Sequence, residues 1–86
     1  MKISVELTLT PLQDDYEEPI KAFIKKLRVS GLKVIENPLS TQVYGEYEEV
    51  MPILQSEIRD VFLHIENGLL HMKLVKSDRS AYEPDF

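Results

Sequence analysis

The sequence predicts an α+β fold in which a four-stranded antiparallel sheet carries two helices on one face. Three observations carry this prediction. The segment 2–10 alternates between apolar and polar residues, as a half-buried strand does. Two later segments repeat their apolar residues with helical spacing. Prolines and glycines divide the rest of the chain into short stretches of β-favouring residues.

The composition indicates one globular domain. The chain has 86 residues, of which 43% are hydrophobic and 29% are charged, as in ordinary folded domains. We expect the domain to occupy residues 1–76. A polar tail is expected at residues 77–86, where Tyr82 or Phe86 could anchor it.

The first strand is expected at residues 2–10 and ends at Pro11. The first helix is expected at residues 16–30, because an apolar stripe recurs there at every third or fourth residue. Its acidic residues come first and its basic residues last, which is the order that the helix dipole favours. Gly31 is suited to end this helix in a left-handed conformation.

Two short strands are expected next, at residues 32–37 and 41–47, with a turn between them. The second helix is expected at residues 48–66, with its start within one turn of Pro52. The last strand is expected at residues 69–76. Two right-handed crossovers then give the ferredoxin-like βαββαβ arrangement, with the first and third strands at the centre of the sheet.

The sheet face without helices is the expected place for a ligand. The first strand presents its polar set on that face: Ser4, Glu6, Thr8 and Thr10. The third strand can present either of two alternating sets: Gln42, Tyr44 and Glu46, or Thr41, Val43 and Gly45. We prefer the first set outward, because Val43 is the better core residue. The last strand is expected to add His71 and Lys73 and to turn three apolar residues inward: Leu70, Met72 and Leu74.

This face admits more than one interpretation. The carboxylates of Glu6 and Glu46 and the ring of Tyr44 could hold a flat cation by charge and stacking. The same residues also fit a solvated sheet face with cross-strand charge pairs. Paired carboxylates can act as acid and base. The chain has no cysteine that could serve as a nucleophile. It also shows no spacing typical of metal ligands. We expect no catalytic and no metal residues, with His64 structural and His71 exposed.

The net charge and the hydropathy of the chain limit the classes of partner that it is expected to bind. The formal net charge of −5 would repel nucleic acid unless basic residues gathered on one face. The basic residues of the first helix are expected to form its solvated face, so no nucleic-acid partner is predicted. A membrane-spanning helix needs about 18 consecutive apolar residues, and no apolar run in this chain is that long. We therefore expect no membrane partner. The lack of cysteine and of an apolar leader favours a cytoplasmic location.

The segment from Asn37 to Met51 resembles the signature of the small thiamine-binding protein family. That signature consists of Pro, a small apolar residue, Ser or Gly, Thr, Gly-Glu, an aromatic residue and an acidic-Val-Met helix start. The first strand, the Pro11-Leu12 turn and the Gly31-Leu32 junction are also similar, so the resemblance covers roughly residues 2–76. The chain departs at residues 12–15, where many relatives have Gly after Pro-Leu.

The resemblance implies a non-enzymatic protein that needs no cofactor and binds thiamine or its hydroxymethylpyrimidine half. It also implies a homodimer or homotetramer assembled through the sheets. Thr41 would be a hydroxyl partner of the ligand, Glu46 an anionic partner, and Glu6 a match on the first strand. The expected ligand-binding residues are Glu6, Thr8, Asn37, Pro38, Leu39, Ser40, Thr41, Gln42, Tyr44 and Glu46. Because an open sheet face leaves a ligand exposed, we expect a second subunit or the loop at residues 37–42 to cover it.

Two alternatives stay open. The chain could be a regulatory or oligomer-assembling sensor domain of the same topology without affinity for thiamine. It could also be a small enzyme of the dimeric α/β-barrel type that uses His71 or Glu6.

Overall fold

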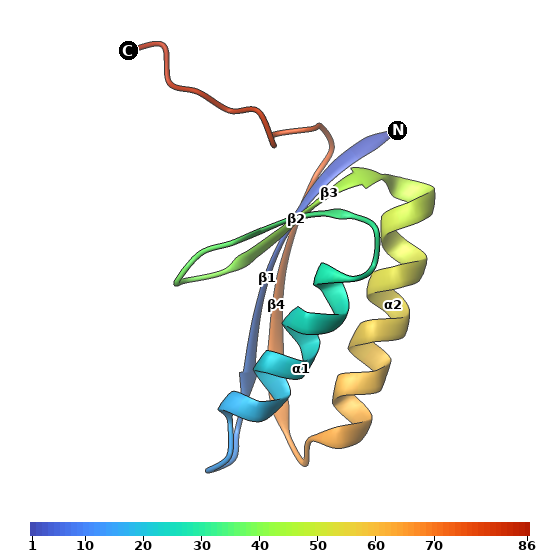
Figure 1. The fold of residues 1–86 in the computed structure, drawn as a ribbon, viewed down its shortest axis with the longest axis vertical. Helices are drawn as coiled ribbons and strands as arrows, with labels where there is room; N and C mark the ends of the chain where they lie inside the picture. Colours follow the sequence, from blue (N-terminus) through green and yellow to red (C-terminus); the bar gives the residue numbers. More distant parts are fainter.

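The computed structural model describes all 86 residues and contains the six expected elements (Figure 1). They are β1 (Lys2–Pro11), α1 (Glu17–Arg28), β2 (Lys33–Glu36), β3 (Thr41–Glu46), α2 (Tyr47–His64) and β4 (Gly68–Val75). All strand pairs are antiparallel and the sheet order is β2-β3-β1-β4, so β1 and β3 are central. The predicted ferredoxin-like α+β fold is confirmed. No helix has both the length and the hydrophobicity needed to cross a bilayer.

The chain turns from β3 into α2 without a loop. Tyr47 was expected to end the strand, but it begins the helix, and its backbone N–H donates to the Met1 carbonyl at 2.8 Å. Gly45 suits this corner, because a Cβ there would crowd a side-chain carbon of Val50 in α2 at 3.1 Å. The helix therefore starts more than one turn before Pro52, earlier than expected. Pro52 has no backbone N–H and so cannot donate a helix hydrogen bond. The missing bond lies near the exposed first turn of α2.

The core lies between the sheet and the two helices. The alternation of β1 places its apolar residues on the helix side, and Val43 of β3 joins them, which confirms the preferred orientation of β3. From the helices, one apolar stripe of each faces the sheet. The most deeply buried side chains are Ile3, Val5, Leu27, Val43, Val50 and Leu54.

The inward-facing residues of β4 are only partly covered. Leu70 packs against the core as expected. Met72 and Leu74 also lie on the helix side, opposite Leu7 and Val5 of β1, but they keep 44% and 48% of their surface exposed. The expectation that they are inside is wrong, because β4 is the edge strand and the helix layer does not reach fully over it.

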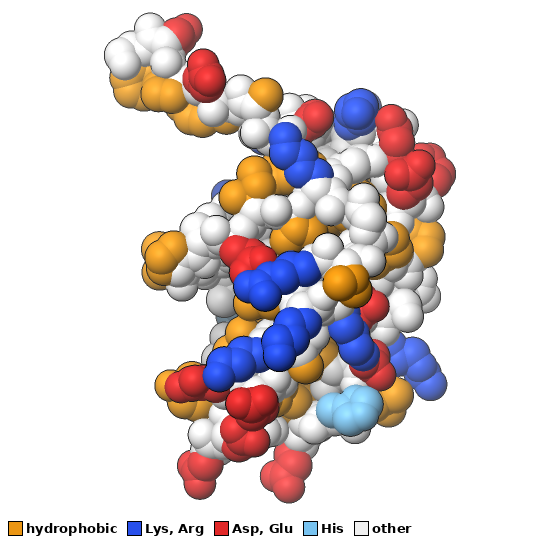
Figure 2. All heavy atoms as spheres, in the orientation of Figure 1, with side chains coloured by type: hydrophobic (Ala, Val, Ile, Leu, Met, Phe, Trp, Pro, Cys, Tyr) orange, Lys and Arg blue, Asp and Glu red, His pale blue; other side chains and the backbone are white.

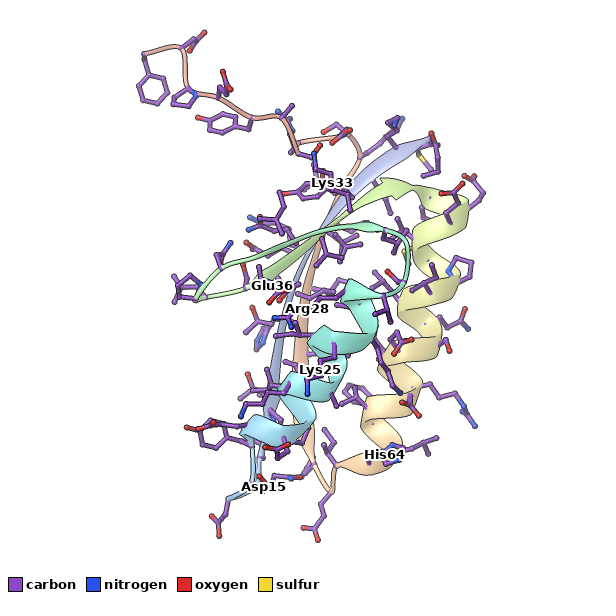
Figure 3. All side chains as sticks on the ribbon, in the orientation of Figure 1. Asp15, Lys25, Arg28, Lys33, Glu36 and His64 are labelled. Carbon is purple, nitrogen blue, oxygen red and sulfur yellow. The ribbon has the colours of Figure 1, made fainter.

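An ion pair joins the end of α1 to β2. The Arg28 guanidinium donates two hydrogen bonds to the Glu36 carboxylate, at 2.6 and 2.7 Å (Figure 3). These hydrogen bonds, more than the charge of Arg28, hold the pKa of Glu36 below its ordinary value. Lys25, on the same helix, has no such partner within the 4.0 Å of an ion pair.

Arg28→Gln is expected to raise the pKa of Glu36 toward its ordinary value, whereas Lys25→Gln should leave it unchanged. Because folding lowers this pKa, the pair stabilises the fold above the unfolded-state pKa of Glu36. That contribution disappears as the pH falls through the folded-state pKa. An NMR titration of the Glu36 carboxyl carbon checks the result, and equal pKa values in the two variants would contradict it.

Candidate functional site

The turn between β2 and β3 is ordered by the side chain of Asn37. Its Oδ1 accepts hydrogen bonds from the backbone N–H groups of Leu39 and Ser40, at 3.3 and 3.0 Å. The Asn37 N–H in turn donates to the Ser40 carbonyl at 3.0 Å. Asn and Pro are favoured in such turns for their side-chain acceptor and fixed backbone angle. The turn is therefore built from Asn37, Pro38, Leu39 and Ser40 themselves.

This turn folds onto the helix-free side of β1. The Ser40 hydroxyl lies 3.0 Å from Glu6 Oε2 and 3.3 Å from Asn37 Oδ1, and it can donate its one proton to either. The Thr8 hydroxyl donates to the Leu39 carbonyl at 3.3 Å. Sequence reasoning expected the loop or a second subunit to cover this face, and the loop does reach it. Figure 1 shows the tip of the β2–β3 hairpin extending from the sheet on the side away from α2.

Two residues of β3 continue this polar chain. The Tyr44 hydroxyl donates to Gln42 Oε1 at 3.2 Å, and Gln42 Nε2 lies 3.5 Å from Ser40 Oγ. Both residues lie opposite outward-facing residues of β1, Gln42 beside Glu6 and Tyr44 beside Ser4. The Tyr44 side chain is buried although no helix covers it. Of the predicted outward set of β3, Gln42 therefore lies directly beside Glu6, and Tyr44 is joined to it through Gln42.

The C-terminal tail crosses the same face at its other end. The buried Ser4 hydroxyl donates to the Ser77 carbonyl at 2.7 Å and accepts from the Arg79 N–H at 2.8 Å. The tail then leaves the body (Figure 1). Tyr82 and Phe86 are 67% and 100% exposed, so neither anchors it. The expectation that Tyr82 or Phe86 anchors the tail is wrong, and Ser4 holds it instead. Its small buried hydroxyl satisfies two backbone groups of the tail that would otherwise need water.

Between the hairpin tip and the tail lies a small open cavity of about 190 Å³. Three predicted site residues line it: Glu6, Gln42 and Tyr44. Five residues outside the predicted set also line it: Ser4, Val5, Lys73, Val75 and Arg79. The alternation of β1 and β4 places Ser4 and Lys73 on this face, so a sequence signal existed for both. No pattern in the polar tail predicts Arg79 there.

Seven predicted residues do not line this cavity: Thr8, Asn37, Pro38, Leu39, Ser40, Thr41 and Glu46. Thr41 pairs with Leu7 and is buried, so its side chain belongs to the helix side of the sheet. Glu46 pairs with Lys2, four positions along β1 from Glu6, or about 13 Å away. Its carboxylate accepts a hydrogen bond from the Met1 ammonium at 2.9 Å, which lowers the pKa of Glu46. The structure therefore does not bring Glu6 and Glu46 together.

A larger hollow of about 430 Å³ lies between α1 and α2. Most of its lining residues are polar or charged, and an ion pair between Lys26 and Asp60 joins the two helices there. His64 hydrogen-bonds the Asp60 carbonyl at 2.7 Å, consistent with its expected structural role, and lies with Asp15 at one end of the helix pair (Figure 3). No group of His, Cys, Asp or Glu in the chain is arranged to hold a metal ion. The helix-free cavity is the better candidate because three predicted residues, Glu6, Gln42 and Tyr44, line it, whereas none lines the hollow between the helices.

Basic side chains gather over α1 (Figure 2). Lys21 lies 3.8 Å from Glu17 and 3.7 Å from Glu18, Lys26 pairs with Asp60, and Arg28 pairs with Glu36. This stripe is the exposed face of the helix, as expected. Because its charges are largely paired with carboxylates, it offers little attraction to a phosphate backbone.

No protein-family model matches the chain, and no curated protein is similar to it in sequence. Its fold is similar to that of a candidate thiamine biosynthesis/salvage protein from Thermotoga maritima. The identity is 25% and the TM-score 0.80, over 90% of this chain and 85% of the other. A protein from Streptococcus pneumoniae is similar with 24% identity and a TM-score of 0.85, over 94% and 92% of the two chains.

A domain of unknown function from Bacillus cereus is similar with 12% identity and a TM-score of 0.76, over 99% of this chain and 85% of that one. The likenesses to the Streptococcus and Bacillus proteins show the fold alone. The chain thus shares its fold with a group of small α+β proteins, of which the Thermotoga protein is described in terms of thiamine. The family resemblance read from residues 37–51 agrees with that neighbour.

Proposed function

We propose that this chain binds the hydroxymethylpyrimidine half of thiamine in the helix-free cavity and does not transform it chemically. The observation that carries the proposal is the Glu6 carboxylate, held at 3.0 Å by the Ser40 hydroxyl of the resembling segment. A carboxylate accepts hydrogen bonds only, and the amino group of the pyrimidine is a donor. The amide of Gln42, which both donates and accepts, suits the adjacent ring nitrogens.

The size and charge of the cavity support the pyrimidine rather than intact thiamine. Its volume of about 190 Å³ is below the range of about 300–1,000 Å³ usual for drug-sized ligands. Lys73 and Arg79 line it beside the single carboxylate of Glu6. Two cations against one anion do not favour the positive thiazolium ring. Thiamine would therefore bind more weakly than its pyrimidine half in a single subunit.

A second subunit over this face stays a prediction. The edge strand β4 supports it, because one edge of the strand is unpaired. A partner that covered the cavity would enlarge the contact surface for a ligand. In the alternative function, the same surfaces would serve assembly alone and the cavity would have no affinity for the pyrimidine.

Glu6→Gln is expected to weaken hydroxymethylpyrimidine binding about tenfold or more, because it removes a charged acceptor while keeping the side-chain shape. Isothermal titration calorimetry measures the effect. Glu46→Gln is the matched control, with the same chemical change outside the cavity. If Glu46→Gln weakens binding and Glu6→Gln does not, the ligand binds at the Glu46 end of β3 and the placement in the cavity is wrong. If neither hydroxymethylpyrimidine nor thiamine at millimolar concentration binds or raises the melting temperature, the proposed function is overturned in favour of the assembling domain.

A further inference from the structure

Two cations in the cavity have no partner within the chain. Lys73 comes from β4 and Arg79 from the tail, six positions further along the chain, and both line the same hollow. Neither side chain takes part in any ion pair or side-chain hydrogen bond of the chain. The neighbouring Asp78 carboxylate is occupied by the Ser80 N–H at 2.9 Å. With ten basic residues against fifteen acidic ones, two free cations in one small hollow are a notable concentration of positive charge.

The strands separate Lys73 from the groups suited to a ring. Glu6 of β1 lies between two partners in register, Gln42 on the β3 side and Lys73 on the β4 side. Ser40 and Tyr44 also lie on the β3 side, whereas the tail enters at Ser4 and brings Arg79. Because neighbouring strands are about 4.8 Å apart, the β3 and β4 sides are separated by about 10 Å. That distance suits a substituted pyrimidine whose far end carries an anionic group.

We propose that the cavity binds the phosphate ester of hydroxymethylpyrimidine, with Glu6 and Gln42 on the ring and Lys73 and Arg79 on the phosphate. This assignment rests on the proposed function and names the form of its ligand. A phosphate monoester carries up to two negative charges at neutral pH, which matches two unpaired cations. Arg79 can donate two parallel hydrogen bonds to phosphate oxygens, and Lys73 adds a point charge.

The phosphate also gives the tail a role. Ser4 fixes the backbone of Ser77 and Arg79, at 2.7 and 2.8 Å, so the Arg79 side chain starts from a defined position beside the cavity. Residues 81–86 of the tail are all exposed. The segment from Ser77 to Arg79 is therefore a phosphate-binding arm attached to the sheet.

The test is isothermal titration calorimetry of the full chain with three probes: hydroxymethylpyrimidine, its phosphate ester and inorganic phosphate. We expect the ester to bind at least about tenfold more tightly than the unphosphorylated compound, a difference that shrinks at high salt. Lys73→Gln and Arg79→Gln should each reduce ester affinity about tenfold and change binding of the unphosphorylated compound less than about twofold. Lys76→Gln is the matched control, since Lys76 is exposed and does not line the cavity.

The outcomes separate this inference from the proposed function. Equal affinities for the ester and the unphosphorylated compound, unchanged by Lys73→Gln and Arg79→Gln, would overturn the inference while the proposed function stood. Inorganic phosphate binding as tightly as the ester would also overturn it, because the ring would then contribute nothing. Loss of all three probes in Lys76→Gln as well would show general electrostatic attraction rather than a site. Absence of binding by every pyrimidine compound would overturn the proposed function and, with it, the inference.

Discussion

Leu54→Ala is expected to destabilise the chain by about 2–5 kcal/mol, the cost of truncating a fully buried leucine. Leu54 lies on α2, is 1% exposed and belongs to the core between the helices and the sheet. The truncation removes packing contacts and leaves a cavity that surrounding side chains fill only in part. In a domain of this size, the melting temperature should fall by about 10 °C or more.

Urea unfolding of Leu54→Ala beside Leu63→Ala gives the comparison. Leu63 is on the same helix but 69% exposed, so its truncation should change stability by less than about 0.5 kcal/mol. A similar loss in both variants would mean that α2 packs on the sheet through a different face. A small loss in both would mean that α2 contributes little to the core.

Ser4→Ala is expected to release the tail and to cost about 1–3 kcal/mol in stability, because it leaves two backbone partners of a buried hydroxyl unsatisfied. Those partners are the Ser77 carbonyl and the Arg79 N–H. Once the tail is free, Arg79 is no longer held at the cavity. Hydrogen exchange of the Arg79 amide should become faster, and affinity for the phosphate ester should fall with that for the ring unchanged.

Ser77→Ala is the control for Ser4→Ala. The Ser77 hydroxyl is buried without a hydrogen-bond partner, and only the backbone carbonyl of this residue binds Ser4. Its removal should leave the Arg79 amide as protected as before. Slow exchange at Arg79 in both variants would show that Ser4 does not hold the tail.

The sequence could identify the resembling segment as a candidate site, but it could not show which residues of that segment line the cavity. Period-two alternation placed Gln42 and Tyr44 outward with Glu6, and the register of β1 and β3 confirms this. The same alternation turns Thr41 inward, so its place in the signature does not bring it to the cavity. Glu46 faces outward as expected, yet its partner on β1 lies four positions along the strand from Glu6. A linear motif does not record these distances, because they depend on strand register.

The sequence by itself determined the order of the six elements, the central strands and the apolar face of β1. Each of these follows from local periodicity and from the handedness of crossovers, which need no knowledge of distant contacts. Only the tertiary structure decided that the Ser40 hydroxyl meets Glu6 and that Ser4 holds the tail with Arg79 beside Lys73. These contacts join residues separated by 34 and 75 positions. They arise because the sheet brings distant segments to one face, where a few hydrogen bonds between exposed or half-buried groups select the arrangement.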